Sequence, residues 1–240
     1  MATDTHIITT KTLAEFFDAY YQHPTKILLL RGNIFSKGDI GKIARVLGLP
    51  YYHGAFAEVR EIKPAPTSTS SLALTAAAHP PHLDGTFAEV TPSAFLLSVV
   101  RSDEGNGGTS QFWPINGMLA ECPADYVEAL QRAVVRYERP RADGSKDSFE
   151  GNILSKDTSG ETVFRWRNDE YVRPEVIEPN AQPIEEAIKW VESYLDRCRP
   201  LELQAEAGDT FLVRQRFYLH GRSALSSAAS NRLLYRTWIY

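Results

Sequence analysis

The sequence predicts a mainly β fold: a β-sandwich or jelly-roll core with flanking helices. Strand-like segments lie near both ends of the chain, and most helix-like segments lie between them. Strand and helix do not alternate as they do in the units of a doubly wound parallel sheet. The chain has 240 residues, enough for one large domain. We therefore expect a single domain over residues 1–240, with helical inserts between the strands.

Hydrophobic periodicity places the elements along the chain. Apolar residues at helical spacing predict helices at 12–22, 39–47, 125–137 and 183–198. Apolar runs predict strands at 26–30, 95–101, 163–167, 210–214, 216–220 and 232–239. The segment 63–78 is rich in Pro, Ser, Thr and Ala, and we expect a mobile surface loop, a kind of segment that often acts as a lid. The polar segment 139–161 is expected to be an exposed insert.

Composition excludes several classes of partner. Lys and Arg number 26 and Asp and Glu number 30, so the net charge is −4, which disfavours nucleic acid and anionic membranes. No apolar run is long enough to span a bilayer, and the N-terminal residues lack a basic-then-apolar signal pattern. The two cysteines lie far apart, which argues against a disulfide framework. We expect a cytoplasmic protein with a small-molecule substrate and no membrane or nucleic-acid partner.

His82 and Asp84 form an H-x-D pattern. On a strand, residues two apart face the same side, so this imidazole and carboxylate could bind one metal ion. A second histidine would complete a facial triad of two histidines and one carboxylate, which leaves three positions open on Fe(II). His220 is the candidate because it ends a predicted strand. The alternatives are a turn at His82 after two prolines and a core role for His220. The nearby His79 could contact the substrate or a metal-binding residue, but the two prolines favour a place in that turn.

The last predicted strand carries two arginines on one face. Arg232 and Arg236 lie about 13 Å apart there, at 3.3 Å per residue, and Leu234 and Trp238 share the face. If this face is buried, both arginines should be paired with anions. One alternative is an exposed edge strand whose charges resist aggregation. Another is a basic nucleic-acid face, which would add further arginines: Arg214, Arg216 and Arg222.

Four motifs occur in a defined order: H-x-D-G-T-F at 82–87, GGT at 107–109, HGR at 220–222 and RLLYRTW at 232–238. Together they resemble the taurine dioxygenase (TauD/TfdA)-like branch of the Fe(II)- and 2-oxoglutarate-dependent oxygenases. The resemblance spans roughly 27–239 and includes LLLRG at 28–32. The HGR motif is most similar to the clavaminate synthase and asparagine oxygenase group. The short interval from His220 to Arg232 is more similar to taurine dioxygenase itself.

The resemblance implies a double-stranded β-helix (jelly roll) with helices packed on one side. It implies that His82, Asp84 and His220 bind iron, with no catalytic group beyond these ligands. Thr109 and Arg232 would hold the far carboxylate of 2-oxoglutarate. A guanidinium suits this task because it can form two parallel charge-assisted hydrogen bonds with a carboxylate.

The resemblance also assigns two residues to the substrate. Arg236 matches a position that faces the primary substrate, often an anionic group. His53 matches a substrate-contacting histidine, although a loop or surface histidine is the favoured alternative.

The implied activity is oxidation of an unactivated C–H bond with Fe(II), O₂ and 2-oxoglutarate, which is converted to succinate and CO₂. Hydroxylation is the default outcome, with desaturation or cyclisation as variants. The substrate would be a small carboxylate- or amino-acid-like molecule. Two alternatives stay open: a cupin-like metal enzyme that does not use 2-oxoglutarate, and a non-catalytic β-sandwich binding module.

Overall fold

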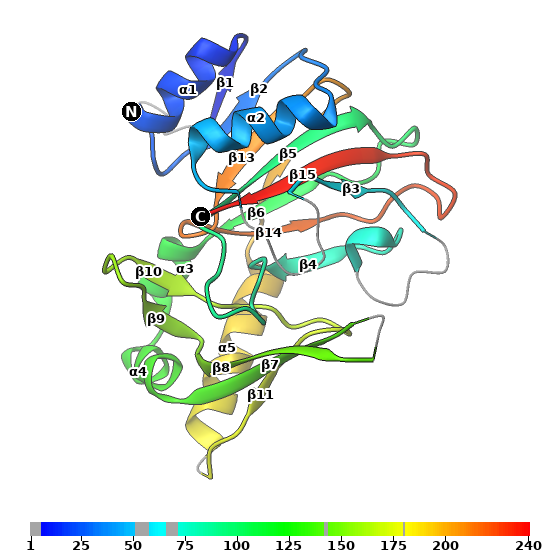
Figure 1. The fold of residues 1–240 in the computed structure, drawn as a ribbon. Coiled ribbons are helices and arrows are strands. Elements are labelled where there is room, and N and C mark those ends of the chain that lie inside the picture. The colour runs from blue at the N-terminus through cyan, green and yellow to red at the C-terminus, as the bar shows by residue number, and fades with distance from the viewer. Residues whose placement is uncertain (1–5, 51–57, 66–71, 142–143, 180) are drawn as a thin grey trace.

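The computed structural model describes residues 6–50, 58–65, 72–141, 144–179 and 181–240. Its larger sheet has six strands in the order β1-β2-β13-β5-β15-β3 (Figure 1). Within it, β1 and β2 pair in parallel and the other neighbours are antiparallel. The strand bounds are β1 (Ile7–Thr10), β2 (Ile27–Leu30), β3 (Arg60–Ile62), β5 (Ala94–Arg101), β13 (Thr210–Arg214) and β15 (Leu233–Ile239).

A second sheet has four strands in the order β12-β6-β14-β4. Its strands are β4 (His79–His82), β6 (Ser110–Pro114), β12 (Leu201–Leu203) and β14 (Tyr218–Arg222). Apolar side chains of both sheets form one core cluster, to which β6 contributes Phe112 and β13 contributes Phe211. The two sheets therefore pack against each other through this cluster.

Helices α1 (Leu13–Gln22) and α2 (Lys37–Leu47) cover the outer face of the six-stranded sheet (Figure 1). Alternation along β2 shows why. Ile27 and Leu29 belong to the core between the sheets, whereas Leu28 and Leu30 pack with the two helices. This strand is buried on both faces, as its continuous apolar sequence predicts.

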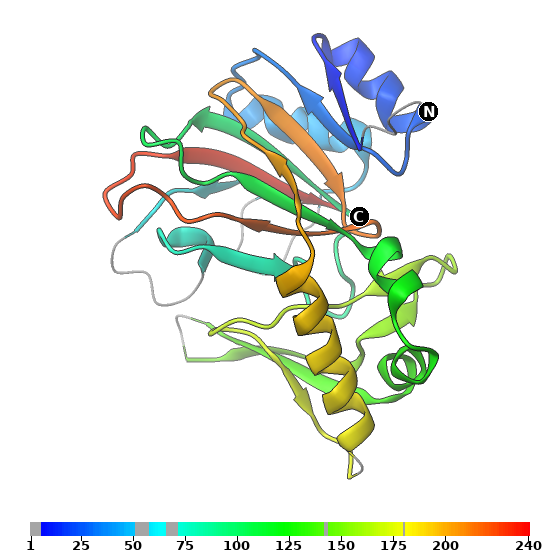
Figure 2. The ribbon, with the colours of Figure 1, turned by 180° about the vertical axis from the view of Figure 1, so that it is seen from behind.

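The other half of the molecule is built from the middle of the chain. It contains a three-stranded sheet, a two-stranded hairpin and three helices, with α5 running along the back (Figure 2). Its bounds are α3 (Ile115–Glu121), α4 (Ala124–Arg132), α5 (Gln182–Arg197), β7 (Val134–Pro140), β8 (Lys146–Asn152), β9 (Leu154–Lys156), β10 (Thr162–Phe164) and β11 (Pro174–Val176). A short 3-10 helix, η1 (Leu72–Leu74), precedes β4.

The prediction of a mainly β protein with several helices is confirmed, and two segments differ. The helix predicted at 125–137 ends at Arg132, and β7 begins at Val134. The adjacent β-branched Val134 and Val135 favour this strand. The exposed insert predicted at 139–161 is also wrong, because it contains β8 and β9 and buries Ile153 completely. Of the loop predicted at 63–78, residues 66–71 lie outside the described part.

Several elements have no counterpart among the predicted ones: α3 and the short strands β1, β3, β4, β6, β8, β9, β11 and β12. Within the described ranges, no helix combines the length and apolar character needed to cross a membrane.

The capping box of α1 gives a direct test of the fold. The Thr12 hydroxyl accepts from the Glu15 N–H at 3.2 Å, and the Glu15 carboxylate accepts from the Thr12 N–H. We expect Thr12→Ala to lower the free energy of unfolding by about 1 kcal/mol. Thr158→Ala, in an exposed turn, is the control and should change it by less than about 0.5 kcal/mol. Equal effects in denaturant titrations would contradict the role of the cap.

Candidate metal centre

Two short strands bring the predicted metal ligands together. In the antiparallel pair of β4 and β14, His220 lies directly opposite His82. Asp84 follows β4 by two residues, and its carboxylate oxygens lie 3.7 Å from His82 Nε2 and 3.6 Å from His220 Nε2. One ligand atom from each residue falls within 4.8 Å of the others. All three side chains are mostly buried, at the junction between the sheets and the other half of the molecule.

Glycines make this close approach possible. A Cβ atom at Gly221 would lie 2.6 Å from the His79 carbonyl oxygen on the neighbouring strand. Gly85, directly after Asp84, has φ +75°, and a Cβ there would lie 2.7 Å from Pro92 Cδ. Side chains other than hydrogen are strained in this backbone region. The glycines of the H-x-D-G and H-G-R motifs are thus explained by packing around the ligands.

The nitrogen atoms of both histidines fit a bound cation. His82 Nδ1 lies 2.9 Å from the Pro80 carbonyl, which only accepts, so Nδ1 carries the proton and Nε2 keeps its lone pair. His82 Nε2 is buried and has no hydrogen-bond partner. Burial, with a contribution from His82, lowers the pKa of His220 to about 4, so His220 is neutral at pH 7. Two imidazoles and one carboxylate are a donor set that suits Fe(II).

The carboxylate of Asp84 is ionised despite its burial. Burial alone would raise its pKa, but Arg236 and the two histidines lower the pKa well below the usual range. Arg236 Nη1 lies 3.3 Å from both carboxylate oxygens, and Trp238 Nε1 donates to Oδ2 at 2.7 Å. Arg236 and Trp238 therefore hold the carboxylate from the β15 side.

Two other residues position the segment that carries Asp84. The Gln215 side chain accepts from the Asp84 N–H at 2.6 Å and donates to the Pro92 carbonyl. The buried Arg165 donates to the backbone carbonyls of the loop after Asp84: Gly85, Thr86, Ala88 and Glu89. Neither Gln215 nor Arg165 was a candidate from the sequence, because both act through backbone groups distant along the chain. For Trp238, the sequence predicted the strand face that it shares with Arg232 and Arg236, but not its hydrogen bond to Asp84.

Arg236 on β15 and Arg232, the residue directly before β15, line one cavity together with His82 and His220. Because β15 lies between β5 and β3, it is not an edge strand, and the interpretation of an exposed edge is wrong. Arg232 is only 8% exposed. Among the described residues its guanidinium makes one long hydrogen bond, from Nη2 to the Gly108 carbonyl at 3.5 Å. The structure therefore favours the interpretation of buried arginines that face an anion.

Buried Arg222 behaves differently from Arg232. Its guanidinium donates to several backbone carbonyls, those of Leu72, Thr75, Ala77 and Ser223. Arg165 likewise donates to backbone carbonyls through its two terminal nitrogens. Burial and the nearby Arg222 lower the pKa of Arg232 to about 10, and Asp103 partly offsets this. Arg232 thus remains charged at pH 7, and most of its donors have no protein partner among the described residues.

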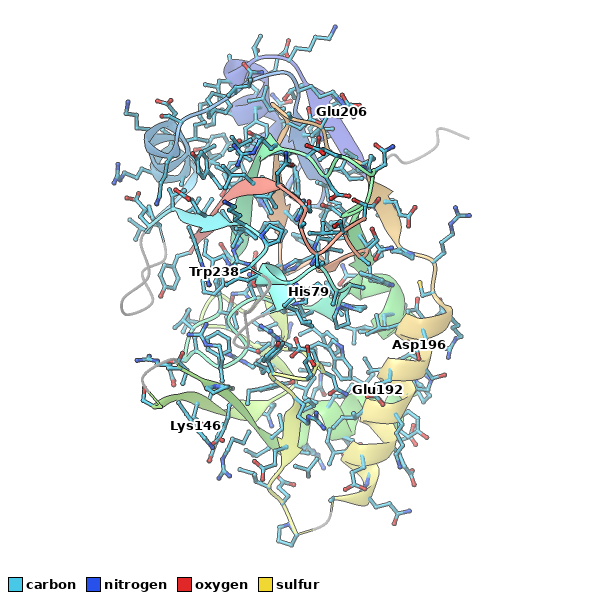
Figure 3. All side chains as sticks on the ribbon, turned by 90° about the vertical axis from the view of Figure 1, so that its right-hand side faces the viewer. His79, Lys146, Glu192, Asp196, Glu206 and Trp238 are labelled. Atoms are coloured by element: carbon cyan, nitrogen blue, oxygen red, sulfur yellow. The ribbon has the colours of Figure 1, made fainter. Side chains whose placement is uncertain are left out.

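The other predicted site residues lie in different surroundings. The Thr109 hydroxyl donates to Gln204 Oε1 at 2.5 Å, and Ser110, not Thr109, borders the cavity. His53 lies outside the described residues. His79 starts β4, so the turn assigned to it is wrong, and it lines the cavity. Its ring stacks on His82 with centroids 3.8 Å apart, and Figure 3 shows His79 and Trp238 midway between the two halves of the molecule.

A comparison with protein families identifies the chain. The model described as "Taurine catabolism dioxygenase TauD, TfdA family" matches residues 4–238. The chain belongs to this TauD/TfdA family. It is therefore a 2-oxoglutarate-dependent non-haem iron dioxygenase that uses Fe(II), 2-oxoglutarate and O₂, as the sequence motifs predict. Membership of this family argues against both alternatives, the non-catalytic binding module and the metal enzyme that does not use 2-oxoglutarate.

Solved structures share the fold of this TauD/TfdA member at low sequence identity. A search of curated protein sequences finds no significant match. Asparagine oxygenase in complex with Fe(II), 2S,3S-3-hydroxyasparagine and succinate has a TM-score of 0.70 and 18% identity, covering 94% of this chain and 78% of that one. The oxygenase OrfP with Fe, succinate and (3S)-hydroxy-L-Arg has a TM-score of 0.69 and 13% identity, covering 94% and 80%.

A third structure, PvcB from Pseudomonas aeruginosa, is described as an Fe, alpha-ketoglutarate dependent oxygenase from an isonitrile synthetic pathway. Its TM-score is 0.66 and its identity is 19%, covering 95% of this chain and 80% of that one. These three likenesses show the fold that the TauD/TfdA member adopts.

The hydrogen bond from Trp238 to Asp84 gives a test of the metal centre. We expect Trp238→Phe to weaken Fe(II) binding by roughly 10–100-fold, because the carboxylate loses a partner that orients it. The matched control is Trp190→Phe on α5, where the ring stacks on Tyr194 away from the metal ligands. Anaerobic competition with a metal-binding dye measures both affinities. Equal affinity in the two variants would contradict the positioning role of Trp238.

The contrast between Arg232 and Arg222 gives a second test. Arg232→Leu should change the free energy of unfolding by less than about 1 kcal/mol, because a desolvated charge is replaced by an apolar side chain and one long hydrogen bond is lost. Arg222→Leu should cost about 2 kcal/mol or more, because it leaves several carbonyls without donors. Denaturant titrations of the metal-free proteins decide this. A similar loss in both variants would mean that Arg232 has a mainly structural role.

Proposed function

We propose that this chain oxidises a C–H bond of a small anionic or amino-acid-like molecule, with hydroxylation as the default outcome. His82, Asp84 and His220 would hold Fe(II), and Arg232 would bind the far carboxylate of 2-oxoglutarate. The observation that carries the proposal is the buried guanidinium of Arg232, which has free donors and lines the same cavity as the two histidines. Such a group is costly in a protein interior unless an anion binds it.

The substrate end of the cavity is assigned to Arg236. Only its Nη1 group contacts Asp84 among the described residues, so its remaining N–H donors are available to a ligand. Apolar side chains complete much of the wall, including Ile62, Leu97 and Leu234. A carboxylate on Arg236, with the rest of the molecule against this wall, would fix the position of the oxidised carbon. His53 stays a predicted substrate contact.

The comparisons agree with a small substrate of this kind. The asparagine oxygenase structure contains 3-hydroxyasparagine, and the OrfP structure contains (3S)-hydroxy-L-Arg. Both ligands are hydroxylated amino acids with a carboxylate. This supports an amino-acid-like substrate for the present chain, and it leaves desaturation and cyclisation as variants of the same chemistry.

We also infer that the six-stranded and four-stranded sheets are the two sides of a double-stranded β-helix. In support, they pack face to face, and both contribute side chains to one cavity. The family match over residues 4–238 supports a single oxygenase domain. Cytoplasmic location stays a prediction from composition.

In the proposed mechanism, Fe(II) with 2-oxoglutarate and O₂ supplies the oxidant that removes a hydrogen atom from the substrate. The residues of the chain bind and orient. Arg232 fixes 2-oxoglutarate from its far end, and Arg236 fixes the substrate. Holding both molecules in reacting geometry is the main contribution that the protein makes to the rate.

A substrate screen tests the proposal. Purified protein with Fe(II), ascorbate and 2-oxoglutarate should form succinate faster when a substrate is added, and each succinate should match one oxidised product. Carboxylic acids and amino acids are the first compounds to test. Succinate formation that no small anionic compound stimulates would contradict the proposed substrate class.

Arg236→Leu separates the roles of the two arginines. We expect the KM for the substrate to rise about 10–100-fold, because a charge-assisted hydrogen bond to its carboxylate is lost. At Fe(II) concentrations that saturate the variant despite its lost contact with Asp84, the dissociation constant of 2-oxoglutarate should change by less than about threefold, because its far carboxylate depends on Arg232. Steady-state kinetics and anaerobic binding measure the two quantities. An equal loss of both affinities would refute the assignment.

A further inference from the structure

Ser110 is a second polar group at the Arg232 end of the cavity. It is the first residue of β6, it lies opposite Arg222 in the ladder with β14, and it is 8% exposed. It lines the cavity together with Arg232 and the two metal-binding histidines. Its hydroxyl makes no hydrogen bond with any residue in the described part of the chain. A hydroxyl that is nearly buried and faces a cavity is available to a ligand.

The neighbouring Thr109 is turned away from this cavity. Its hydroxyl is taken up by Gln204 Oε1 at 2.5 Å. Thr109 directly precedes β6, and because side chains alternate along an extended chain, Thr109 and Ser110 face opposite sides. The same alternation places Gln111 outward, where its side chain donates to Glu202, and Phe112 inward with Ser110. At the start of β6, the Ser110 hydroxyl therefore faces the cavity and the Thr109 hydroxyl faces Gln204.

The backbone before Ser110 borders the Arg232 guanidinium directly. Arg232 Nη2 contacts the Gly108 carbonyl, and a Cβ atom at Gly108 would lie 3.3 Å from Arg232 Nε and 2.7 Å from Leu225. Gly108 also has φ +74°. This glycine keeps the chain close to the guanidinium as it enters β6. A carboxylate has about four acceptor sites, so it can bind a guanidinium and a hydroxyl together.

We propose that Ser110, and not Thr109, donates the hydroxyl hydrogen bond to the far carboxylate of 2-oxoglutarate. This inference rests on the proposed role of Arg232. The family resemblance assigns the hydroxyl donor to Thr109, and the proposal assigns it to the next residue, Ser110. The carboxylate would accept two N–H donors from Arg232 and one O–H donor from Ser110. The Thr109 side chain would stay bonded to Gln204 and would contribute to the surface of the sheet.

The test compares two adjacent variants by calorimetric titration of 2-oxoglutarate into anaerobic Fe(II)-loaded protein. Ser110→Ala should raise the dissociation constant about tenfold, because a hydrogen bond to a charged group is lost. Thr109→Val should change it by less than about twofold. Ser110→Thr keeps the hydroxyl and should bind within about threefold of the wild type, which separates loss of the hydroxyl from a change in folding.

A second ligand isolates the far carboxylate. 2-Oxobutyrate keeps the keto-acid end but lacks the far carboxylate, so its affinity should be the same in Ser110→Ala and the wild type. A tenfold loss for 2-oxobutyrate as well would point to a general disturbance and overturn the inference. So would an effect of Thr109→Val with none for Ser110→Ala. If the wild type binds Fe(II) but not 2-oxoglutarate, the proposed function fails first and the assignment of Ser110 fails with it.

Discussion

The carboxylate of Asp84 is buried at the meeting point of β4, β14 and β15, and the rest of the site is arranged around its charge. A buried carboxylate is costly unless cations or donors surround it. Arg236 and Trp238 approach from β15, and His82 and His220 approach from the four-stranded sheet. The buried lone pair of His82 Nε2 has no partner in the protein. A divalent cation would satisfy this nitrogen and the carboxylate together.

A second constraint is that three buried arginines differ in how many hydrogen-bond partners the protein gives their guanidinium groups. Arg165 and Arg222 donate to backbone carbonyls and so fix the loops on either side of the H-x-D motif. The Arg232 guanidinium makes only one long hydrogen bond among the described residues. The same side chain therefore serves as structural support at two positions, and at the third it lines a cavity with most of its donors unpaired among the described residues. The number of satisfied donors distinguishes these roles, and residue type alone does not.

Local spacing in the sequence could predict that His82 and Asp84 lie together and that Arg232 and Arg236 face one side. Their grouping with His220 depends on the pairing of β4 with β14, and it was predicted from the end of a strand and from the family resemblance. Gln215 and Arg165 were missed because each acts on the backbone of a segment distant along the chain. The same limit applies to the segment at 139–161, whose polar strands carry few apolar residues to indicate burial. The direction of the Thr109 side chain depends on Gln204, which no local pattern identifies.

The most direct test of the account is an anaerobic titration with Fe(II) and then 2-oxoglutarate, followed by visible absorption. We expect a weak charge-transfer band in the wild type that requires both additions. The band should be absent in Asp84→Ala, and in Arg232→Leu it should appear only at much higher 2-oxoglutarate concentrations. Its absence in folded wild-type protein that binds iron would contradict the account. A normal titration of Arg232→Leu would contradict the assignment of the 2-oxoglutarate site.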